Sequence, residues 1–275
     1  MTPNAKRQIE ELLTAVSRSP RSLLMLDYDG TLAPFRKERD QATPYPGISS
    51  VIEKIIRSGK SRVVIISGRD AGDLVRLINI DPHPEIWGFH GLQRLMSDGC
   101  LELSPLDPRT ISALANAENW LREQNLVSAA EFKTGSIAVH WRGLSENEAE
   151  SIRGRALMGW ISIARHSPLK LFEFDGGVEI RGTEADKGDA VRTILSEMKF
   201  KTPAAYLGDD TTDEHAFAAI EGRGLSVLVR PRKRTTAAQV WLKPPDELLD
   251  FLMWWLQAVE QPSSWSPDSS LRINL

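Results

Sequence analysis

Short apolar runs alternate with amphipathic segments over the first 80 residues of the chain. Leu23–Leu26 and Arg62–Ile66 are continuous apolar runs typical of strands buried on both faces. Ile48–Ser58 and Asp70–Ile78 have the spacing of helices with one apolar side. The order strand, helix, strand, helix predicts a parallel sheet with right-handed crossovers.

The same alternation returns after residue 183. Lys187–Lys199 and Asp213–Ala219 are predicted helices, and Ala204–Leu207 and Leu225–Val229 are predicted strands. The polar segment 1–22 and the segment 246–260 are expected to form amphipathic helices, and the turn-rich tail 261–275 is expected to be loosely ordered. The fold class is therefore α/β, with a Rossmann-like parallel-sheet core.

The middle of the chain follows a different pattern. A helix is expected to begin after Ser104 or Asp107, and a second one is expected from Glu146 to about Ile161. The segments "LKLFEF" and "VEIRG" flank a glycine-bearing turn, which predicts a β-hairpin. We interpret 107–183 as an inserted α+β cap domain, and 1–106 and 184–275 as the two parts of the core domain.

Composition limits the function classes. With 275 residues, 41% apolar residues and a net charge of −3, the chain has material for a real core and does not suit a general nucleic-acid or membrane-surface binder. Cys100 is the only cysteine, and no signal-peptide-like or membrane-spanning apolar segment is found, so a soluble cytoplasmic protein is expected. The basic run Arg230–Arg234 is interpreted as a solvated loop.

Polar residues mark four predicted strand or helix ends. They are Asp27-Tyr28-Asp29-Gly30-Thr31, Ser67-Gly68-Arg69, Lys187-Gly188, and Asp209-Asp210 with Asp213. Taken singly, each has a plainer explanation as a helix cap, a turn or a surface lysine. Taken together, they predict one site, because ligands bind beyond the carboxyl ends of parallel strands.

Crowded carboxylates indicate a hard divalent cation, and we expect Mg²⁺. With Mg²⁺ and Lys187 screening its charge, Asp27 is suited to attack a phosphorus atom and form an aspartyl-phosphate. Since the backbone can turn beyond the strand, the second ligand after Asp27 is either the Asp29 carboxylate or a main-chain carbonyl.

The motifs "DYDGTL", "SGR", Lys187 and "GDDTTDE" resemble, in order and spacing, the four motifs of the haloacid dehalogenase superfamily of phosphatases. The resemblance implies that Asp27 is the nucleophile and Asp29 the acid and base, while Ser67 and Lys187 hold the phosphoryl oxygens and Asp213 orients Lys187 or metal-bound water. It implies Mg²⁺ ligands from Asp27, the Asp29 carbonyl and Asp209. The further residues expected at the substrate are Tyr28, Gly30, Thr31, Gly68, Arg69 and His90, with backbone amides of 28–30 facing the phosphoryl group.

The insert resembles the cap domain of the trehalose-6-phosphate phosphatases in "GFHGLQR", "EFKTGSIAVHWRG" and "VEIRGTEADKGDAV". The positions that match are Glu131, Lys133, Ser136, His140, Arg142 and Glu179, and we expect Glu131, Lys133, Arg142 and Glu179 to bind the sugar. Glu131 and Lys133 face the same way in a strand. The plainer alternatives are a solvated salt bridge for this pair and a core position for His140, which is not expected to bind metal.

Two positions depart from the family pattern. Gln93 stands where an acid is usual, which removes a charge near the sugar or hinge. Gly182 stands where proline is usual, and we expect it to loosen the hinge.

The expected function is Mg²⁺-dependent hydrolysis of trehalose 6-phosphate in trehalose biosynthesis, beside a trehalose-6-phosphate synthase. The alternatives are a phosphatase for another phosphorylated glycoside, such as glucosylglycerol phosphate or a mannosyl ester, and a catalytically silent sugar-phosphate-binding regulator.

Overall fold

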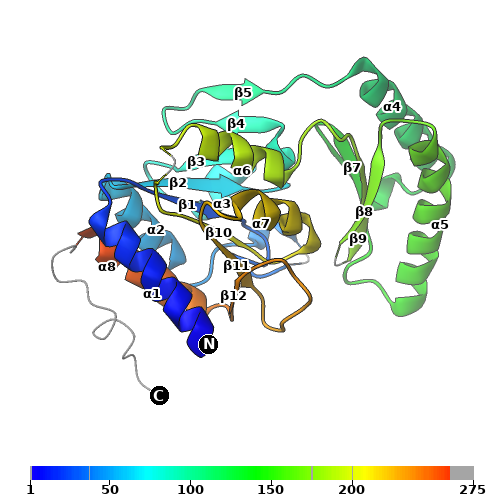
Figure 1. Ribbon diagram of the computed structural model, residues 1–275. Coiled ribbons are helices and arrows are strands. Elements are labelled where there is room, and N and C mark those ends of the chain that lie inside the picture. The colour runs from blue at the N-terminus through cyan, green and yellow to red at the C-terminus, as the bar shows by residue number, and fades with distance from the viewer. Residues whose placement is uncertain (1, 37, 175, 200, 261–275) are drawn as a thin grey trace. The chain divides into compact units, whose positions relative to one another are not determined.

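The computed structural model describes residues 2–36, 38–174, 176–199 and 201–260 (Figure 1). The expected loose tail, 261–275, and Asp175 in the expected turn lie outside this part. The chain forms two compact units, one of Met1–Glu102 with Lys187–Leu275 and one of Leu103–Asp186. The second unit begins a few residues before the expected cap, 107–183, and ends a few residues after it.

The first unit is built on a sheet of eight strands, counted over the described residues, in the order β12-β11-β10-β1-β2-β3-β4-β5. All pairs from β12 to β3 are parallel, and β3–β4 is antiparallel. The strands are β1 (Ser22–Leu26), β2 (Ser61–Ile66), β3 (Glu85–Gly88), β4 (Gln93–Leu95), β5 (Leu101–Leu103), β10 (Ala204–Gly208), β11 (Leu225–Val229) and β12 (Val240–Leu242). The predicted parallel core is thus confirmed.

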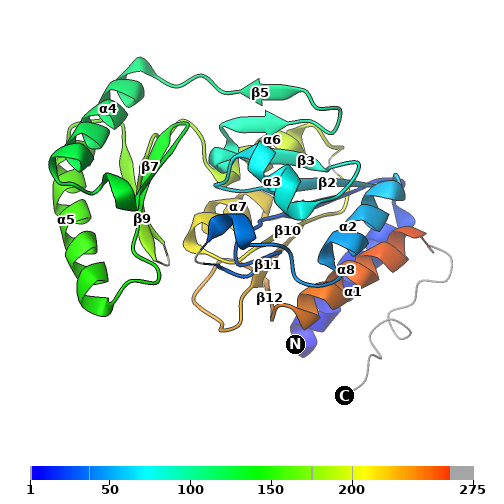
Figure 2. The same ribbon diagram turned by 180° about the vertical axis from the view of Figure 1, so that it is seen from behind.

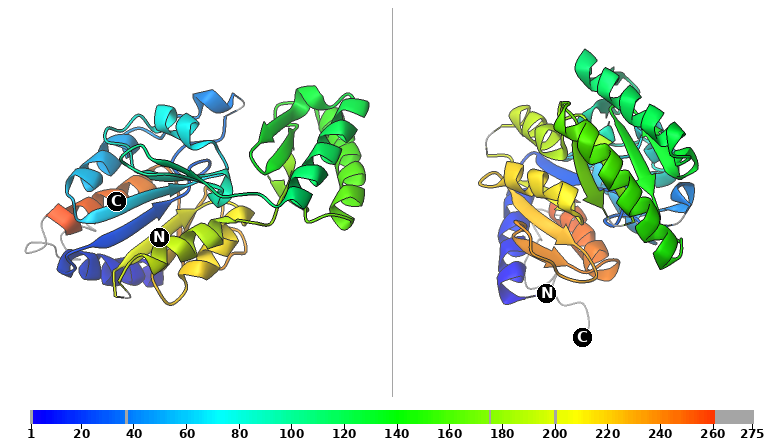
Figure 3. Two further views of the ribbon diagram at one scale, coloured as in Figure 1. Left: turned by 90° about the horizontal axis from the view of Figure 1, so that it is seen from above. Right: turned by 90° about the vertical axis from the view of Figure 1, so that its right-hand side faces the viewer.

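Helices cover both faces of this sheet (Figures 2 and 3). On one face lie α1 (Pro3–Arg18), α2 (Ile48–Arg57), α3 (Ala71–Ile78) and α8 (Asp246–Glu260). On the other lie α6 (Lys187–Ser196) and α7 (Glu214–Ile220). Because side chains alternate along a strand, β1 sends Leu24 and Leu26 to the first face and Leu23 and Met25 to the second.

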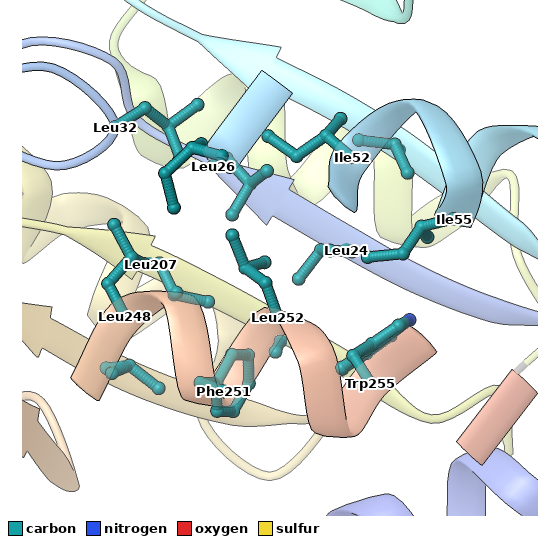
Figure 4. Close-up of a cluster of buried hydrophobic side chains, with 14 of the residues drawn as sticks. Leu24, Leu26, Leu32, Ile52, Ile55, Leu207, Leu248, Phe251, Leu252 and Trp255 are labelled. Atoms are coloured by element: carbon teal, nitrogen blue, oxygen red, sulfur yellow. The ribbon is translucent and has the colours of Figure 1, made fainter. Parts of the chain in front are cut away.

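The larger core lies between β1, α2 and α8 (Figure 4). Phe251 and Trp255 of α8 lie one helical turn apart with ring centroids 6.1 Å from each other, and both are fully buried. The Trp255 indole N–H donates to Ser61 Oγ at 2.9 Å, so its one polar atom is satisfied. Such packing fixes β1, and with it the turn that follows β1.

The second unit is a four-stranded antiparallel sheet in the order β6-β7-β9-β8, with two helices on one face. Its elements are α4 (Pro108–Glu123), β6 (Ala130–Lys133), β7 (Ser136–His140), α5 (Glu146–Arg165), β8 (Lys170–Phe174) and β9 (Gly177–Arg181). Asp107 is the N-cap of α4, accepting from the Arg109 N–H at 2.7 Å, which decides between the two expected caps. Ala117 and Trp160 join the helices to the apolar face of the sheet, as an α+β unit requires.

A few boundaries differ from the sequence expectation. The helix expected to end near Ile161 continues to Arg165, and the one expected to reach Lys199 ends at Ser196. The helix expected from Asp213 begins as a short 3₁₀ turn (η4, Thr211–Asp213) before α7. Within the described part of the chain, no helix combines the length and apolar character needed to cross a membrane.

Candidate active site

The turn after β1 presents a buried carboxylate. Asp27 follows the last residue of β1 and is 3% exposed, and its Oδ2 accepts from Thr31 Oγ1 at 3.0 Å. Gly30 has φ of +82°, and a Cβ there would overlap the Asp209 carboxylate. Glycine is therefore required both by its backbone angle and by the closeness of the second acid. The Gly30 N–H donates to Ala33 O at 2.7 Å, so the expectation that backbone amides of 28–30 face a phosphoryl group is not met at Gly30.

Lys187 links the acids. It is the first residue of α6, it is buried, and its Nζ donates to Asp27 Oδ1 at 2.6 Å and to Asp213 Oδ1 at 2.7 Å. The contacts of Lys187 thus join three of the four polar clusters that the sequence places far apart.

Asp213 is fully engaged by hydrogen bonds. Its Oδ1 accepts from Lys187 and from the Tyr206 hydroxyl at 2.5 Å. Its Oδ2 accepts from the backbone N–H of Asp209 at 3.0 Å and of Asp210 at 2.9 Å. A carboxylate with four such donors is suited to orienting its neighbours rather than to reacting.

The site has more negative than positive charge. Burial raises the pKa of Asp27 to about 7, against the attraction of Lys187. Burial, followed by the charge of Asp27, raises the pKa of Asp209 well above its usual range. For Asp213 the charge and hydrogen bond of Lys187 outweigh burial and lower the pKa, and for Lys187 the two acids outweigh burial and raise it. Three buried carboxylates thus share one buried lysine, and burial disfavours the charged forms of Asp27 and Asp209.

The donor set fits a hard divalent ion. Asp27, Asp209 and Asp213 each offer an oxygen within 4.8 Å of the others, and all three residues are buried. Asp213 accepts four hydrogen bonds, whereas Asp27 accepts one at each oxygen, from Lys187 and from Thr31, so Asp27 and Asp209 are better placed than Asp213 to bind a metal. Oxygen ligands with excess negative charge are what Mg²⁺ requires. The expected ligand from Asp29 is its carbonyl, and this assignment stays a prediction.

The Asp29 side chain points to a different partner. Arg69 donates from Nε to Asp29 Oδ2 and from Nη2 to Oδ1, both at 2.6 Å, and from Nη1 to Arg39 O at 2.7 Å. This paired geometry holds Asp29 beside Asp27 but outside the group of acids around Lys187. Arg69, expected at the substrate, is therefore joined to the expected acid and base.

The loop after β2 carries Ser67 and packs against His90. Ser67 Oγ accepts from the Arg69 N–H at 3.2 Å, and Ser67 O accepts from the His90 N–H at 2.8 Å. A Cβ on Gly68 would meet the His90 ring, so only glycine permits this close packing. Tyr28, also expected at the substrate, turns its side chain into the core and donates from its hydroxyl to Ala42 O at 2.7 Å.

In the second unit, the sheet face away from the helices carries a cluster of polar side chains. Lys133 Nζ and Ser136 Oγ donate to Glu179 Oε1 at 2.9 and 2.8 Å, whereas Lys133 Nζ lies 3.8 Å from Glu131 Oε2. The side chains of Lys133 and Glu179 are 8% and 4% exposed, whereas that of Glu131, the other member of the expected salt bridge, is 33% exposed.

His140 belongs to the same face and is not a core residue. It is one-third exposed, and its Nε2 lies 2.9 Å from Glu131 Oε2. Together with Arg142 it borders a pocket of about 590 Å³ that also touches Ser128 and the first turns of α5. Such a volume is within the usual range for small-molecule sites.

Both departures from the family pattern have a local explanation. Gln93 Oε1 accepts from the Ala71 N–H at 3.0 Å and its Nε2 donates to Asp70 Oδ2 at 2.9 Å, so these bonds of Gln93 brace the start of α3. The Gly182 N–H donates to Gly135 O at 3.1 Å, a bond that proline cannot make. Glycine at position 182 thus permits a hydrogen bond at the end of β9. The expectation that Gly182 loosens the hinge did not take this bond into account.

Sequence reasoning missed several residues of the site. Tyr206 lies inside β10, where it resembles an ordinary apolar strand position. Arg230 and Arg234, interpreted as solvated, contact the turn that carries Asp209. The basic run "RPRKR" was the only signal in the sequence, and its spacing did not indicate a partner.

Solved structures identify the fold. The C-terminal domain of Candida albicans trehalose-6-phosphate phosphatase matches with a TM-score of 0.77 and 20% identity over 90% of this chain and 96% of that chain. A haloacid dehalogenase-like hydrolase from B. subtilis matches with a TM-score of 0.61 and 14% identity over 84% of this chain and 99% of that chain. The fold is therefore that of the haloacid dehalogenase-like hydrolases, with the Rossmann-like core and inserted α+β unit expected from the sequence.

Sequence comparison gives the family. Residues 25–243 match the family model described as trehalose-phosphatase. A trehalose-phosphate phosphatase of Mycobacterium ulcerans is 28% identical over 246 residues, which cover 84% of this chain and 60% of the relative. The chain belongs to the trehalose-phosphatase family, and it spans about three-fifths of the length of the curated relatives it matches.

Proposed function

We propose that this chain is a Mg²⁺-dependent phosphatase that hydrolyses trehalose 6-phosphate to trehalose and phosphate through an aspartyl-phosphate. The observation that carries the proposal is the contact of Lys187 Nζ with both Asp27 and Asp213, beside Asp209. This arrangement supplies a nucleophile, a cation for the phosphoryl oxygens and a place for a metal. Membership of the trehalose-phosphatase family supports the choice of substrate.

In the proposed first step an Asp27 oxygen attacks phosphorus, and the bond from phosphorus to the sugar O6 breaks. Asp29 gives its proton to O6, so the sugar leaves as a neutral alcohol. Both Asp29 carboxylate oxygens accept from Arg69 at 2.6 Å, so this step requires Asp29 to leave Arg69 and to reach O6 as the acid.

In the second step Asp29 takes a proton from water, whose oxygen attacks the same phosphorus. The phosphorus–Asp27 bond breaks and inorganic phosphate is released. Lys187 and Ser67 hold the phosphoryl oxygens in both steps, and Asp213 keeps Lys187 charged and directed at Asp27. Bound Mg²⁺, held by Asp27, Asp209 and the Asp29 carbonyl, would neutralise charge on the phosphoryl oxygens.

The sugar is proposed to bind to the polar face of the cap unit. Glu179 and Glu131 supply acceptors, and Lys133 and Arg142 supply donors, for the hydroxyls of a neutral disaccharide. We assign substrate choice to this unit and phosphoryl transfer to the core. A trehalose-6-phosphate synthase is the partner that such an enzyme needs to supply its substrate.

The test is phosphate release in Mg²⁺ from trehalose 6-phosphate, glucose 6-phosphate, sucrose 6-phosphate and glucosylglycerol phosphate, with Asp27→Asn as the blank. Faster phosphate release from trehalose 6-phosphate than from the other esters supports the proposal. Glu179→Gln should then slow release from trehalose 6-phosphate much more than release from p-nitrophenyl phosphate, a control substrate without a sugar. Preference for another glycoside keeps the chemistry and refutes the substrate. Mg²⁺-dependent binding of trehalose 6-phosphate without release of phosphate from any ester refutes the reaction and favours the silent regulator.

A further inference from the structure

The loop between β11 and β12 contains two kinds of basic residue. Arg232 and Lys233 are exposed, as a solvated loop predicts, whereas the side chains of Arg230 and Arg234 are 30% and 20% exposed. The two partly buried arginines lie four positions apart and contact the same short segment, the turn of Asp209 and Asp210 after β10.

The arginines hold the carbonyl groups of that turn. Arg234 donates from Nη2 to Asp210 O at 2.7 Å and from Nε to Asp209 O at 3.4 Å, and Arg230 Nη1 donates to Asp209 O at 3.2 Å. The N–H groups of the same two residues donate to Asp213 Oδ2. Donors and acceptors of both residues are therefore fixed, which leaves the turn little freedom to move.

The loop is itself anchored to the start of α7. The Glu214 carboxylate accepts from Arg234 Nη1, from Thr236 Oγ1 at 2.8 Å and from the Ala237 N–H at 2.8 Å. The Trp241 indole donates to Arg230 O at 2.8 Å. Arg234 thus connects the turn of Asp209 and Asp210 to a loop that is itself held by several hydrogen bonds.

We propose that Arg234, assisted by Arg230, is a positioning residue that sets the Asp209 carboxylate for a divalent cation. Asp209 is 4% exposed, so the path of its backbone decides where its oxygens lie. Mg²⁺ tolerates little departure from octahedral geometry, and contacts beyond its direct ligands tune its affinity. This inference rests on the proposed function in so far as the ion is Mg²⁺.

Charge and placement predict opposite effects of removing the arginine. Arg230 Nη1 lies 3.9 Å from carboxylate oxygens of both Asp209 and Asp210, and Arg234 adds a second positive charge nearby. If charge were the main influence, neutralising Arg234 would tighten Mg²⁺ binding. If placement is the main influence, Arg234→Gln and Arg234→Lys both weaken it, because lysine keeps the charge but lacks the planar fork that reaches two carbonyls.

The experiment uses the full chain without substrate. Mg²⁺ binding is measured by calorimetry for the wild type, Arg234→Gln, Arg234→Lys and the matched control Arg232→Gln. Amide exchange of residues 207–214 is followed in EDTA. We expect both Arg234 variants to bind Mg²⁺ about tenfold more weakly or worse, with faster exchange of the turn, and Arg232→Gln to match the wild type. In phosphate release, saturating Mg²⁺ should restore most of kcat, which a general folding defect would not allow.

Each outcome decides the matter. Equal or tighter Mg²⁺ binding by a folded Arg234→Gln overturns the inference, and Arg234→Lys carries the same test if the glutamine variant does not fold. If the wild type takes up no Mg²⁺, the proposed metal dependence fails and this inference fails with it. If the wild type binds Mg²⁺ and the Arg234 variants bind it equally well, the inference alone fails and the proposed function stands.

Discussion

Asp27→Asn should stabilise the metal-free protein while abolishing phosphate release. Three buried carboxylates face one buried lysine, and burial raises the pKa of Asp27 from 3.8 to about 7. Asparagine keeps the size and the acceptor for Lys187 but removes one charge. Lys187 then pairs with Asp213, and Arg230 remains 3.9 Å from Asp209.

The magnitude follows from the pKa. The folded protein keeps the Asp27 proton up to about pH 7, whereas the unfolded chain releases it near 3.8, so the folded state binds more protons between these values. The free energy of unfolding of the wild type therefore falls as pH rises through this window. The free energy of unfolding of the wild type is therefore expected to be lower than that of Asp27→Asn by about 4 kcal/mol above pH 7 and by about 2 kcal/mol at pH 5.5.

The assay is urea unfolding followed by tryptophan fluorescence in EDTA at pH 5.5 and 8.5. The matched control is Asp73→Asn on α3, whose side chain is 53% exposed and for which we expect a change within about 0.5 kcal/mol. Added Mg²⁺ should stabilise the wild type more than Asp27→Asn. If Asp27→Asn is less stable than the wild type in EDTA at pH 8.5, the reasoning is refuted. That result would mean that the attraction between Asp27 and Lys187 outweighs the cost of burying the Asp27 charge.

Three further substitutions test other parts of the structure. Gly30→Ala should reduce phosphate release at least about tenfold and weaken Mg²⁺ binding, since its Cβ would overlap the Asp209 carboxylate; unchanged Mg²⁺ affinity in calorimetry would contradict this. Gln93→Glu should lower the free energy of unfolding by about 1–2 kcal/mol at pH 7 by placing an acid beside Asp70, while KM for trehalose 6-phosphate stays the same; a changed KM would return Gln93 to the sugar site. Phe251→Ala should cost about 3–5 kcal/mol in urea unfolding, and a loss below about 1 kcal/mol would show that the core can collapse around the missing ring.

The core of the site could be predicted because its residues follow strand ends. Asp27 and Ser67 each come directly after a strand with a continuous apolar run, and Asp209 follows β10. In a parallel sheet these ends share one edge, so sequence order and strand prediction were enough to bring the clusters together. The apolar runs were clear because both faces of β1, β2 and β10 are covered by helices.

The elements that were missed are short. The strands β3, β4, β5 and β12 have only three or four residues each, too few to show a period of two. The β5 segment also has exposed leucines at Leu101 and Leu103, which do not resemble a buried strand. These short strands are placed in the sheet by hydrogen bonds to their neighbours, and the spacing of apolar residues along the sequence does not reveal such pairing.

Contacts from loops escaped prediction for a similar reason. Arg234 reaches Asp209 and Asp210 across more than 20 positions of sequence, and the same basic run includes Arg232 and Lys233, which are exposed. The four basic residues of this run cannot be told apart by composition. What separates them is the path of the loop, which depends on the hydrogen bonds of Glu214.

The alternation of side chains along β6 predicts only part of the contacts of Lys133. The alternation of side chains placed Glu131 and Lys133 on one side of a strand, but it did not indicate that Lys133 Nζ lies nearer to Glu179, at 2.9 Å, than to Glu131, at 3.8 Å. The strand register supplies the reason: Ala138 of β7 lies opposite Glu131 on one side and Glu179 on the other. Because alanine is small, Lys133 can extend across β7 to Glu179, and a large side chain at this position would separate the acceptor and donor proposed to bind the sugar.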